Sequence, residues 1–150
     1  MKFVLYNIRY ATGSGWKFHF PIPFSGYFRP TNRNLEQICR FLKDTSPDII
    51  GLVEVDNGSF RTEKFSQAEN IARQLGFTHV YESKYGLGSF PQYLPVMREQ
   101  GNAFLTNQNI HATGFHYFEK GIKRLVIELE FENFVIFLVH LSVRFRHRHD

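Results

Sequence analysis

Three polar residues interrupt stretches of the sequence that are otherwise apolar and typical of buried strands. Asn7 lies in the segment 2–9, Glu54 ends the run 48–54, and His140 follows the apolar residues 134–139. Burying a polar side chain is costly unless it is paired, so each needs a partner or a function. An amide, a carboxylate and an imidazole that converge on one edge of a sandwich suit a hydrated Mg²⁺ and a phosphate. The alternative, that each residue is a satisfied core residue, stays open for any of them taken singly.

The elements that must position these residues alternate between strands and helices. Apolar side chains fall on both faces of the segment 2–9, which predicts a central strand covered on both sides. One helix is predicted from an N-cap at Thr31 to Ser46, and a second from a capping box at Ser66 and Glu69 to Gly76. Further strands are predicted at 48–54, 77–82, 101–106, 111–118, 123–131 and 134–141, the last two as a hairpin. This order predicts one compact α/β (α+β) body.

Composition excludes a disordered or fibrous chain and favours anionic partners. The formal net charge is +4, which favours nucleic acid, phospholipid headgroups or phosphorylated small molecules. Arg29 and Arg98, with Arg33 and Lys84, are candidates for phosphate contacts, although basic loop residues are often simply solvated. The aromatic loop 11–30 follows Asn7 and has three interpretations: stacking on bases, insertion into a lipid surface, or capping the sandwich.

Cysteine usage and the N-terminus bear on the compartment. The single cysteine, Cys39, falls on an apolar helical stripe and is predicted to be a buried core thiol. No apolar signal region follows Met1, and no stretch reaches the length of a membrane span. We therefore expect a cytoplasmic protein.

Four segments in order resemble the endonuclease/exonuclease/phosphatase superfamily of Mg²⁺-dependent phosphoesterases. They span most of the sequence and read YNIR at 6–9, PDIIGLVEV at 47–55, GNAFLT at 101–106 and VHLS at 139–142. The resemblance implies a four-layer α-β-β-α sandwich. It also implies a hydrolase of phosphodiesters or phosphomonoesters, without distinguishing nucleases, lipid phosphodiesterases and sugar or inositol phosphatases.

The resemblance also implies roles for individual residues. Glu54 matches the carboxylate that binds Mg²⁺, or Mn²⁺ as an alternative, and Asn7 matches an amide that orients this metal site. His140 matches the histidine that contacts the scissile phosphate, and Glu99 falls near its acidic partner. Mg²⁺ accepts one or two carboxylates together with phosphate oxygens, so a single Glu at a strand end suffices as its main protein ligand.

The sequence departs from the family pattern at several places. Val53 stands where the family usually has Gln, and Val139 stands where Thr is common. The D-x-N segment and the D-H pair that the family places further along are not in the sequence. We therefore expect residues 1–150 to be the N-terminal portion of a single domain that is inactive alone. The alternative is a non-catalytic protein that uses the same fold to bind nucleic acid or a lipid surface.

Overall fold

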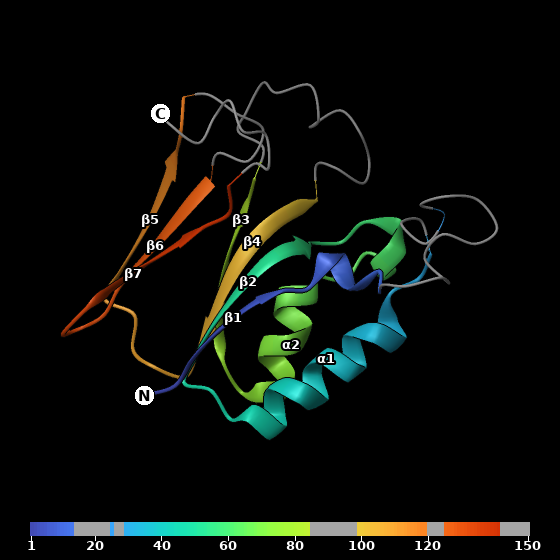
Figure 1. The fold of residues 1–150 in the computed structure, drawn as a ribbon, viewed down its shortest axis with the longest axis horizontal. Coiled ribbons are helices and arrows are strands. Elements are labelled where there is room, and N and C mark those ends of the chain that lie inside the picture. Colours follow the sequence, from blue (N-terminus) through green and yellow to red (C-terminus); the bar gives the residue numbers. More distant parts are fainter. Residues whose placement is uncertain (14–24, 26–28, 85–98, 120–124, 142–150) are drawn as a thin grey trace.

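The computed structural model describes residues 1–13, 25, 29–84, 99–119 and 125–141. Most of the predicted aromatic loop 11–30 and of the loop 85–99 lies outside the described residues. The described residues form three layers: two helices, a four-stranded sheet and a three-stranded sheet (Figure 1). The predicted α/β class is therefore confirmed, and the fourth layer of the predicted sandwich stays a prediction.

The first sheet contains the strands that end on Asn7 and near Glu54. Its strands are β1 (Phe3–Asn7), β2 (Ile49–Asp56), β3 (Thr78–Ser83) and β4 (Gln100–Thr106), in the order β1-β2-β4-β3. β1 runs parallel to β2, whereas β4 is antiparallel to both β2 and β3. Every residue of β4 is buried, and Glu54 is the only residue of β2 that is not. Of the two acidic residues of β2, Asp56 is fully buried and Glu54 alone is partly exposed.

Two helices cover one face of this sheet, as their sequence periodicity predicted (Figure 1). The buried residues of α1 (Asn32–Thr45) are the predicted stripe of Leu35, Ile38, Cys39 and Leu42. Burial raises the pKa of the Cys39 thiol, as expected for a core cysteine.

Both ends of α2 (Gln67–Leu75) follow the prediction. The Ser66 hydroxyl accepts a hydrogen bond from the Glu69 N–H at 3.3 Å, and Gly76 ends the helix with φ of 70°.

The start of α1 differs from the prediction. Thr31 precedes the helix but its side chain makes no capping bond, and its backbone has φ −111° and ψ −2°. The Thr31 hydroxyl instead donates to the Arg61 carbonyl at 3.4 Å and accepts from the Gln67 amide at 3.3 Å. The Thr31 hydroxyl therefore belongs to a buried polar network, and it is not available to cap the helix.

The second sheet packs on the other face of the first. It consists of β5 (Ala112–Tyr117), β6 (Leu125–Glu130) and β7 (Val135–Val139) in that order. β6 and β7 form the predicted hairpin, closed by a hydrogen bond from the Phe131 N–H to the Phe134 carbonyl at 2.9 Å. The apolar residues between the sheets include Ile49, Val53, Phe104, Leu125, Ile127, Leu129 and Leu138.

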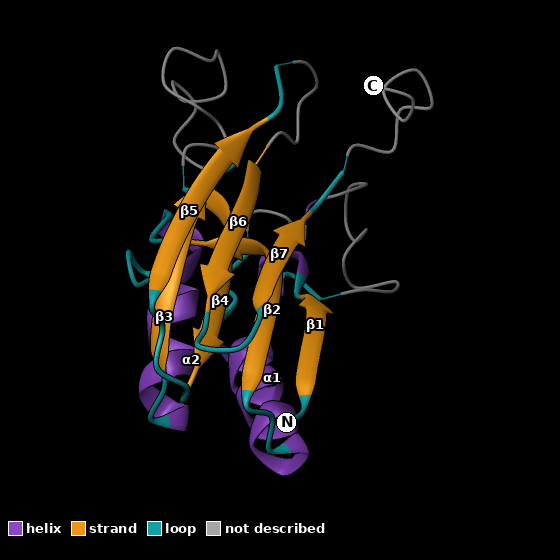
Figure 2. Cartoon of the chain, turned by 90° about the vertical axis from the view of Figure 1, so that its left-hand side faces the viewer, coloured by secondary structure: helices purple, strands orange, loops and turns teal. Residues whose placement is uncertain are grey.

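β1 is an edge strand among the described residues, so the prediction that it is central and covered on both sides is wrong for them. Figure 2 shows the second sheet over the other strands of the first sheet, with β1 beyond β7. The consequence is that Phe3 is 42% exposed and Leu5 is 61% exposed. Val4 and Tyr6, on the opposite face, pack against the helical side. Within the described residues, no helix has both the length and the apolar character needed to span a membrane.

The exposed apolar side chains of β1 and β7 give a testable prediction. We expect a polypeptide of residues 1–150 to associate or to bind a hydrophobic dye, because Leu5 and Phe137 present apolar area to water. Replacing both by Ser is expected to reduce dye binding while changing the free energy of unfolding by only about 0.5 kcal/mol per site. Leu52→Ala, at a fully buried position, is the control and should cost about 2–5 kcal/mol. A monomeric parent that binds no dye would contradict the prediction.

Candidate active site

Glu54 sits in a β-bulge near the end of β2. The register against β4 shifts between Val53, which faces Asn102, and Val55, which faces Gly101, so Glu54 is an extra residue in the ladder. Its φ is 59°, in the left-handed region that residues other than glycine rarely adopt. The Glu54 N–H donates to the Oδ1 atom of Asn102 at 3.3 Å, so a side chain replaces the lost ladder partner.

The bulge changes which face of the sheet the end of β2 presents. Ile50 and Leu52 face the helices, whereas Ile49 and Val53 face the second sheet. Strict alternation would place Val55 toward the second sheet, yet it packs in the helical core. The extra residue at Glu54 accounts for this change of phase, and it frees the carboxylate from the helical core.

His140 meets Glu54 where the two sheets come together. It directly follows β7 in the second sheet, and its Nε2 atom lies 3.6 Å from the Glu54 Oε1 atom. This distance is that of an ion pair when the imidazole is protonated, but it is too long for a direct hydrogen bond. The two side chains are 18% and 17% exposed, so both are largely buried yet reachable from solvent.

Asn7 lies beside this pair at the end of β1. It is the register partner of Val53, the residue before Glu54, and the next residue, Ile8, donates its N–H to the Val53 carbonyl at 3.1 Å. The Asn7 Oδ1 atom accepts from the Arg9 N–H at 3.0 Å. The structure thus brings the three predicted strand-end residues to one edge of the sandwich, while their roles remain predictions.

A left-handed turn follows Asn7. The residues of the short helix η1 (Arg9–Ala11) all have positive φ, between 47° and 57°. Three such residues in a row are costly for side chains other than glycine, and they persist only where surrounding contacts fix them. One contact is a hydrogen bond from the Asn34 side chain to the Ala11 carbonyl at 2.8 Å.

Glu99 is held at the entrance to β4 through its backbone. Its carbonyl accepts from the Asn57 N–H at 2.8 Å and from the Tyr81 hydroxyl at 3.0 Å. Burial raises the pKa of the Tyr81 phenol far above its usual range, and the nearby carboxylates of Glu99 and Asp56 act in the same direction. Tyr81 therefore remains a hydrogen-bond donor at any physiological pH. Pairing of the Glu99 carboxylate with His140 stays a prediction.

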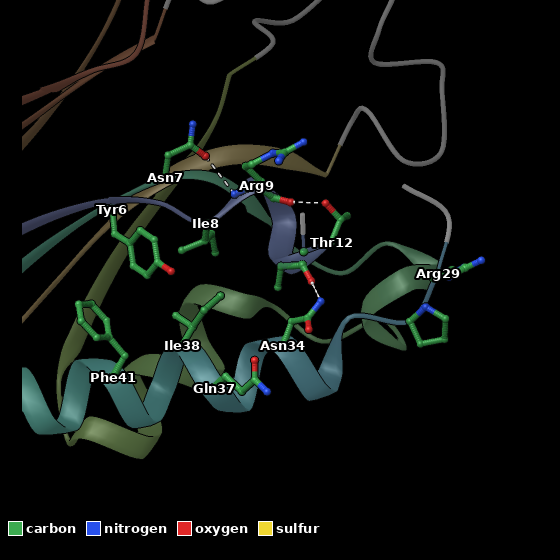
Figure 3. A pocket seen from close by; sticks show the side chains of 13 residues that line it. Tyr6, Asn7, Ile8, Arg9, Thr12, Arg29, Asn34, Gln37, Ile38 and Phe41 are labelled. Carbon is green, nitrogen blue, oxygen red and sulfur yellow. Dashed lines mark hydrogen bonds between the residues drawn. The ribbon is translucent and has the colours of Figure 1, made fainter. Parts of the chain in front are cut away.

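A cavity of about 610 Å³ opens beside Asn7, between η1 and α1, and its lining includes neither Glu54 nor His140. Figure 3 shows Asn7 and Arg9 on one side of it, Asn34 and Gln37 of α1 on the other, and Arg29 at the far end. The predicted phosphate contact Arg29 thus belongs to the same hollow as Asn7, and its side chain is exposed. The second predicted contact, Arg98, lies outside the described residues.

Asn102 is the site residue that sequence reasoning left without a role. It is 2% exposed and is the acceptor for the Glu54 N–H. A polar residue inside the apolar run 101–106 is the same signal that singled out Asn7, but only the bulge shows what the amide does.

The donor set beside Glu54 is suited to Mg²⁺. Glu54 offers a carboxylate and Asn7 an amide oxygen, and oxygen atoms are the ligands that this hard cation prefers. Across the ranges that the structure describes, no three His, Cys, Asp or Glu side chains form a group able to hold a metal ion. A metal held here would therefore depend on one carboxylate, with water and substrate oxygens as the remaining ligands.

Comparison with known proteins identifies the fold. No protein-family profile and no curated protein matches the sequence. An endonuclease/exonuclease/phosphatase family protein from Leptotrichia buccalis matches in structure with a TM-score of 0.52 at 14% identity, over 95% of this chain and 54% of that one. An AP endonuclease from Archaeoglobus fulgidus matches with a TM-score of 0.47 at 19% identity, over 75% of this chain and 38% of that one. A 3' phosphatase from Neisseria bound to a product DNA hairpin gives 0.48 at 20% identity, with the same coverage.

The chain has the endonuclease/exonuclease/phosphatase fold, as its four sequence segments indicated. It spans about half of the length of the Leptotrichia buccalis chain that it matches. Because the sequence identity is only 14%, the likeness establishes the fold and does not establish an activity.

The strained backbone at Glu54 gives a prediction about stability. Glu54→Gly is expected to leave the free energy of unfolding unchanged or to raise it by about 1 kcal/mol, because glycine adopts positive φ without strain. Glu130→Gly is the control: Glu130 ends β6 and is exposed, with no positive φ, so this change should cost about 0.5–1 kcal/mol. Urea unfolding of both variants measures the difference. An equal loss in the two would show that the backbone at Glu54 is unstrained.

Proposed function

We propose that the protein is a metal-dependent hydrolase of phosphate esters whose active site is built on Glu54, Asn7 and His140. The observation that supports it most is the bulge at Glu54. It holds a carboxylate in a strained conformation at the junction of the two sheets, 3.6 Å from an imidazole. Strain of this kind costs about 1–3 kcal/mol and is concentrated at functional sites, where the geometry is worth more than the lost stability.

Glu54 and Asn7 would hold Mg²⁺, with Mn²⁺ as the alternative. Glu54 supplies the charge, and Asn7 supplies an amide oxygen from the neighbouring strand. When bound, the ion offsets the negative charge that develops on the phosphate. The Glu54 carboxylate is 17% exposed, so a cation from solvent can reach it.

His140 would act on the phosphate. In its protonated form an imidazole donates N–H groups, and the His140 Nε2 atom lies 3.6 Å from the Glu54 Oε1 atom, within the distance of an ion pair. Glu99 is the second carboxylate proposed for this histidine, since the backbone places it at the entrance to β4 next to the end of β2. A protonated histidine would stabilise a phosphate oxygen more strongly as the negative charge on that oxygen grows in the transition state.

The basic residues near the cavity would orient the rest of the substrate. Arg29 lines a cavity that Asn7 also lines and that Glu54 and His140 do not, so Arg29 would contact the part of a substrate that extends past Asn7. Arg98 is proposed for the same role. Phosphodiesters and phosphomonoesters both fit this arrangement, and nucleic acid, phospholipids and phosphorylated small molecules all carry such groups.

A non-catalytic binding protein is the second candidate. It is favoured by the small number of metal-ligating groups, because the described part of the chain gathers no three His, Cys, Asp or Glu side chains. Such a protein would bind nucleic acid or a lipid surface but would hydrolyse no phosphate ester under any metal condition. A measurement of phosphate-ester hydrolysis therefore distinguishes the hydrolase from the binding protein.

The metal role of Glu54 is tested by Glu54→Gln in the full-length gene product. The substitution keeps the shape and removes the charge, so hydrolysis of a chromogenic phosphodiester should fall on the order of 10²-fold or more. Chelation of divalent cations should abolish the parent activity. Glu130→Gln, on an exposed site of β6, is the matched control and should leave the rate unchanged. Full activity of Glu54→Gln, or parent activity that persists in chelator, would contradict the metal-binding role of Glu54.

The role of His140 is tested against a second His–Glu pair, which lies within the second sheet. His140→Ala should lower turnover by about 10²-fold or more and change substrate binding much less, because the lost contact strengthens in the transition state. His116 pairs with Glu128 at 2.6 Å on β5 and β6, so His116→Ala is the matched control and should leave turnover unchanged. Turnover on the chromogenic phosphodiester and on single-stranded DNA, with the melting temperature, measures both. A destabilised His140→Ala enzyme with normal turnover would make His140 a core residue.

A further inference from the structure

One buried amide joins the backbone segments that leave the two strands of the candidate site. Gln67 is the first residue of α2 and is fully buried. Its Oε1 atom accepts from the Asp56 N–H at 3.0 Å, and its Nε2 atom donates to the Tyr10 carbonyl at 2.8 Å. Asp56 lies two positions after Glu54, and Tyr10 lies three positions after Asn7. A single side chain thus bridges the exits of β1 and β2.

Both bridged segments have a backbone that needs support. Glu54 has φ of 59° in the bulge, and Tyr10 has φ of 57° in the left-handed turn after Asn7. Each conformation costs about 1–2 kcal/mol for a residue other than glycine, so neither is stable by itself. The Gln67 oxygen accepts a hydrogen bond from the residue two positions after the bulge, and the Gln67 nitrogen donates a hydrogen bond to the left-handed turn. The two strained segments are therefore tied together by the Gln67 side chain, beyond the last bond between the strands, which runs from the Ile8 N–H to the Val53 carbonyl at 3.1 Å.

The surroundings of Gln67 leave it little freedom. The Asp56 carboxylate pairs with the fully buried Arg61 guanidinium, whose Cζ atom lies 5.1 Å from the centre of the Tyr10 ring. The Gln67 amide also donates to the Thr31 hydroxyl at 3.3 Å. Every anchor of the bridge is therefore itself held by a buried contact, and a shift at one end would be transmitted to the other.

We propose that Gln67 is a positioning residue that fixes the distance between Asn7 and Glu54 and so sets the affinity of the site for its metal ion. This inference rests on the proposed function. Neither anchor depends on a side chain of Asp56 or Tyr10, because both hydrogen bonds go to backbone groups. The bridge therefore needs a particular side chain at residue 67. That side chain must be long enough to reach both segments, and it must carry both a hydrogen-bond acceptor and a donor. Only glutamine among the uncharged side chains of this length does so.

The test is Gln67→Met in the full-length gene product, with the rate of hydrolysis measured against Mg²⁺ and Mn²⁺ concentration. Methionine has a similar length but makes neither hydrogen bond. The metal concentration for half-maximal activity is expected to rise about 10- to 100-fold, as is typical when a residue that orients metal ligands is lost. At saturating metal the turnover should approach that of the parent, because Glu54 and His140 are intact.

The matched control is Thr106→Val at the opposite end of the first sheet. Thr106 is also fully buried, and its hydroxyl donates to the Asp48 carbonyl at 2.9 Å, before the start of β2. Losing this bond should lower the melting temperature without changing the metal concentration that the enzyme needs. If Gln67→Met lowers the melting temperature in the same way and leaves the metal requirement unchanged, Gln67 is merely structural and the inference is overturned.

A second variant keeps the test decisive if Gln67→Met does not fold. Asn34 is half-buried and donates to the Ala11 carbonyl, so Asn34→Ala loosens the same left-handed turn from the side of α1. It should raise the metal requirement in the same direction by a smaller factor, and an unchanged requirement counts against the inference. A parent enzyme that hydrolyses without metal contradicts the proposed function and this inference together. A metal-dependent parent with an unchanged Gln67→Met variant contradicts the inference alone.

Discussion

The buried ion pair of Asp56 and Arg61 is the interaction on which the end of the molecule carrying the candidate site depends. Both side chains are fully buried, and the Arg61 Nε atom donates to the Asp56 Oδ2 atom at 3.0 Å. The other carboxylate oxygen accepts from the N–H groups of Gly58 at 3.1 Å and Ser59 at 2.8 Å. Removing one partner of such a pair typically costs about 3–5 kcal/mol, because an unpaired charge is left in the interior. The chain after β2 is therefore forced into one tight loop.

That loop is hydrogen-bonded to the residue before α1 and is linked through Asp56 to the start of α2. The Arg61 carbonyl accepts from the N–H of Thr31, just before α1, and the N–H of Asp56 binds Gln67 at the start of α2. The ends of β1 and β2 and the starts of both helices thus meet in one polar cluster. A cluster of this kind gives less stability than an apolar core of equal size, but it defines a single geometry. The proposed metal site would need such a fixed geometry, because it has one carboxylate and no second one to compensate if that ligand is displaced.

Much of this arrangement is visible in the sequence, and the rest is not, for identifiable physical reasons. The periodicity of apolar residues locates the strands and both helices, and a polar residue at each strand end points to Asn7, Glu54 and His140. The bulge leaves no such trace, because the run 48–54 reads as a regular strand and the phase changes only through pairing with β4 at Asn102. Thr31 has the residue type and position of a cap, yet a distant carbonyl competes for its hydroxyl. The edge position of β1 depends on which strands lie opposite it, and alternation within 2–9 contains no information about that.

Two His–Glu pairs among the described residues involve the second sheet, and their environments differ: His116 and Glu128 both lie within that sheet, whereas His140, directly after β7, meets Glu54 of the first sheet. His116 and Glu128 are 57% and 30% exposed and in close contact at 2.6 Å, so water screens their charges and the pair contributes little. His140 and Glu54 are far less exposed and lie 3.6 Å apart at the junction of the sheets. Charges in such a place are screened less than charges on an exposed strand, so an ion pair formed here interacts more strongly than the exposed one. The bulge is what allows this contact, because strict alternation along β2 would direct Glu54 toward the helical core and away from His140.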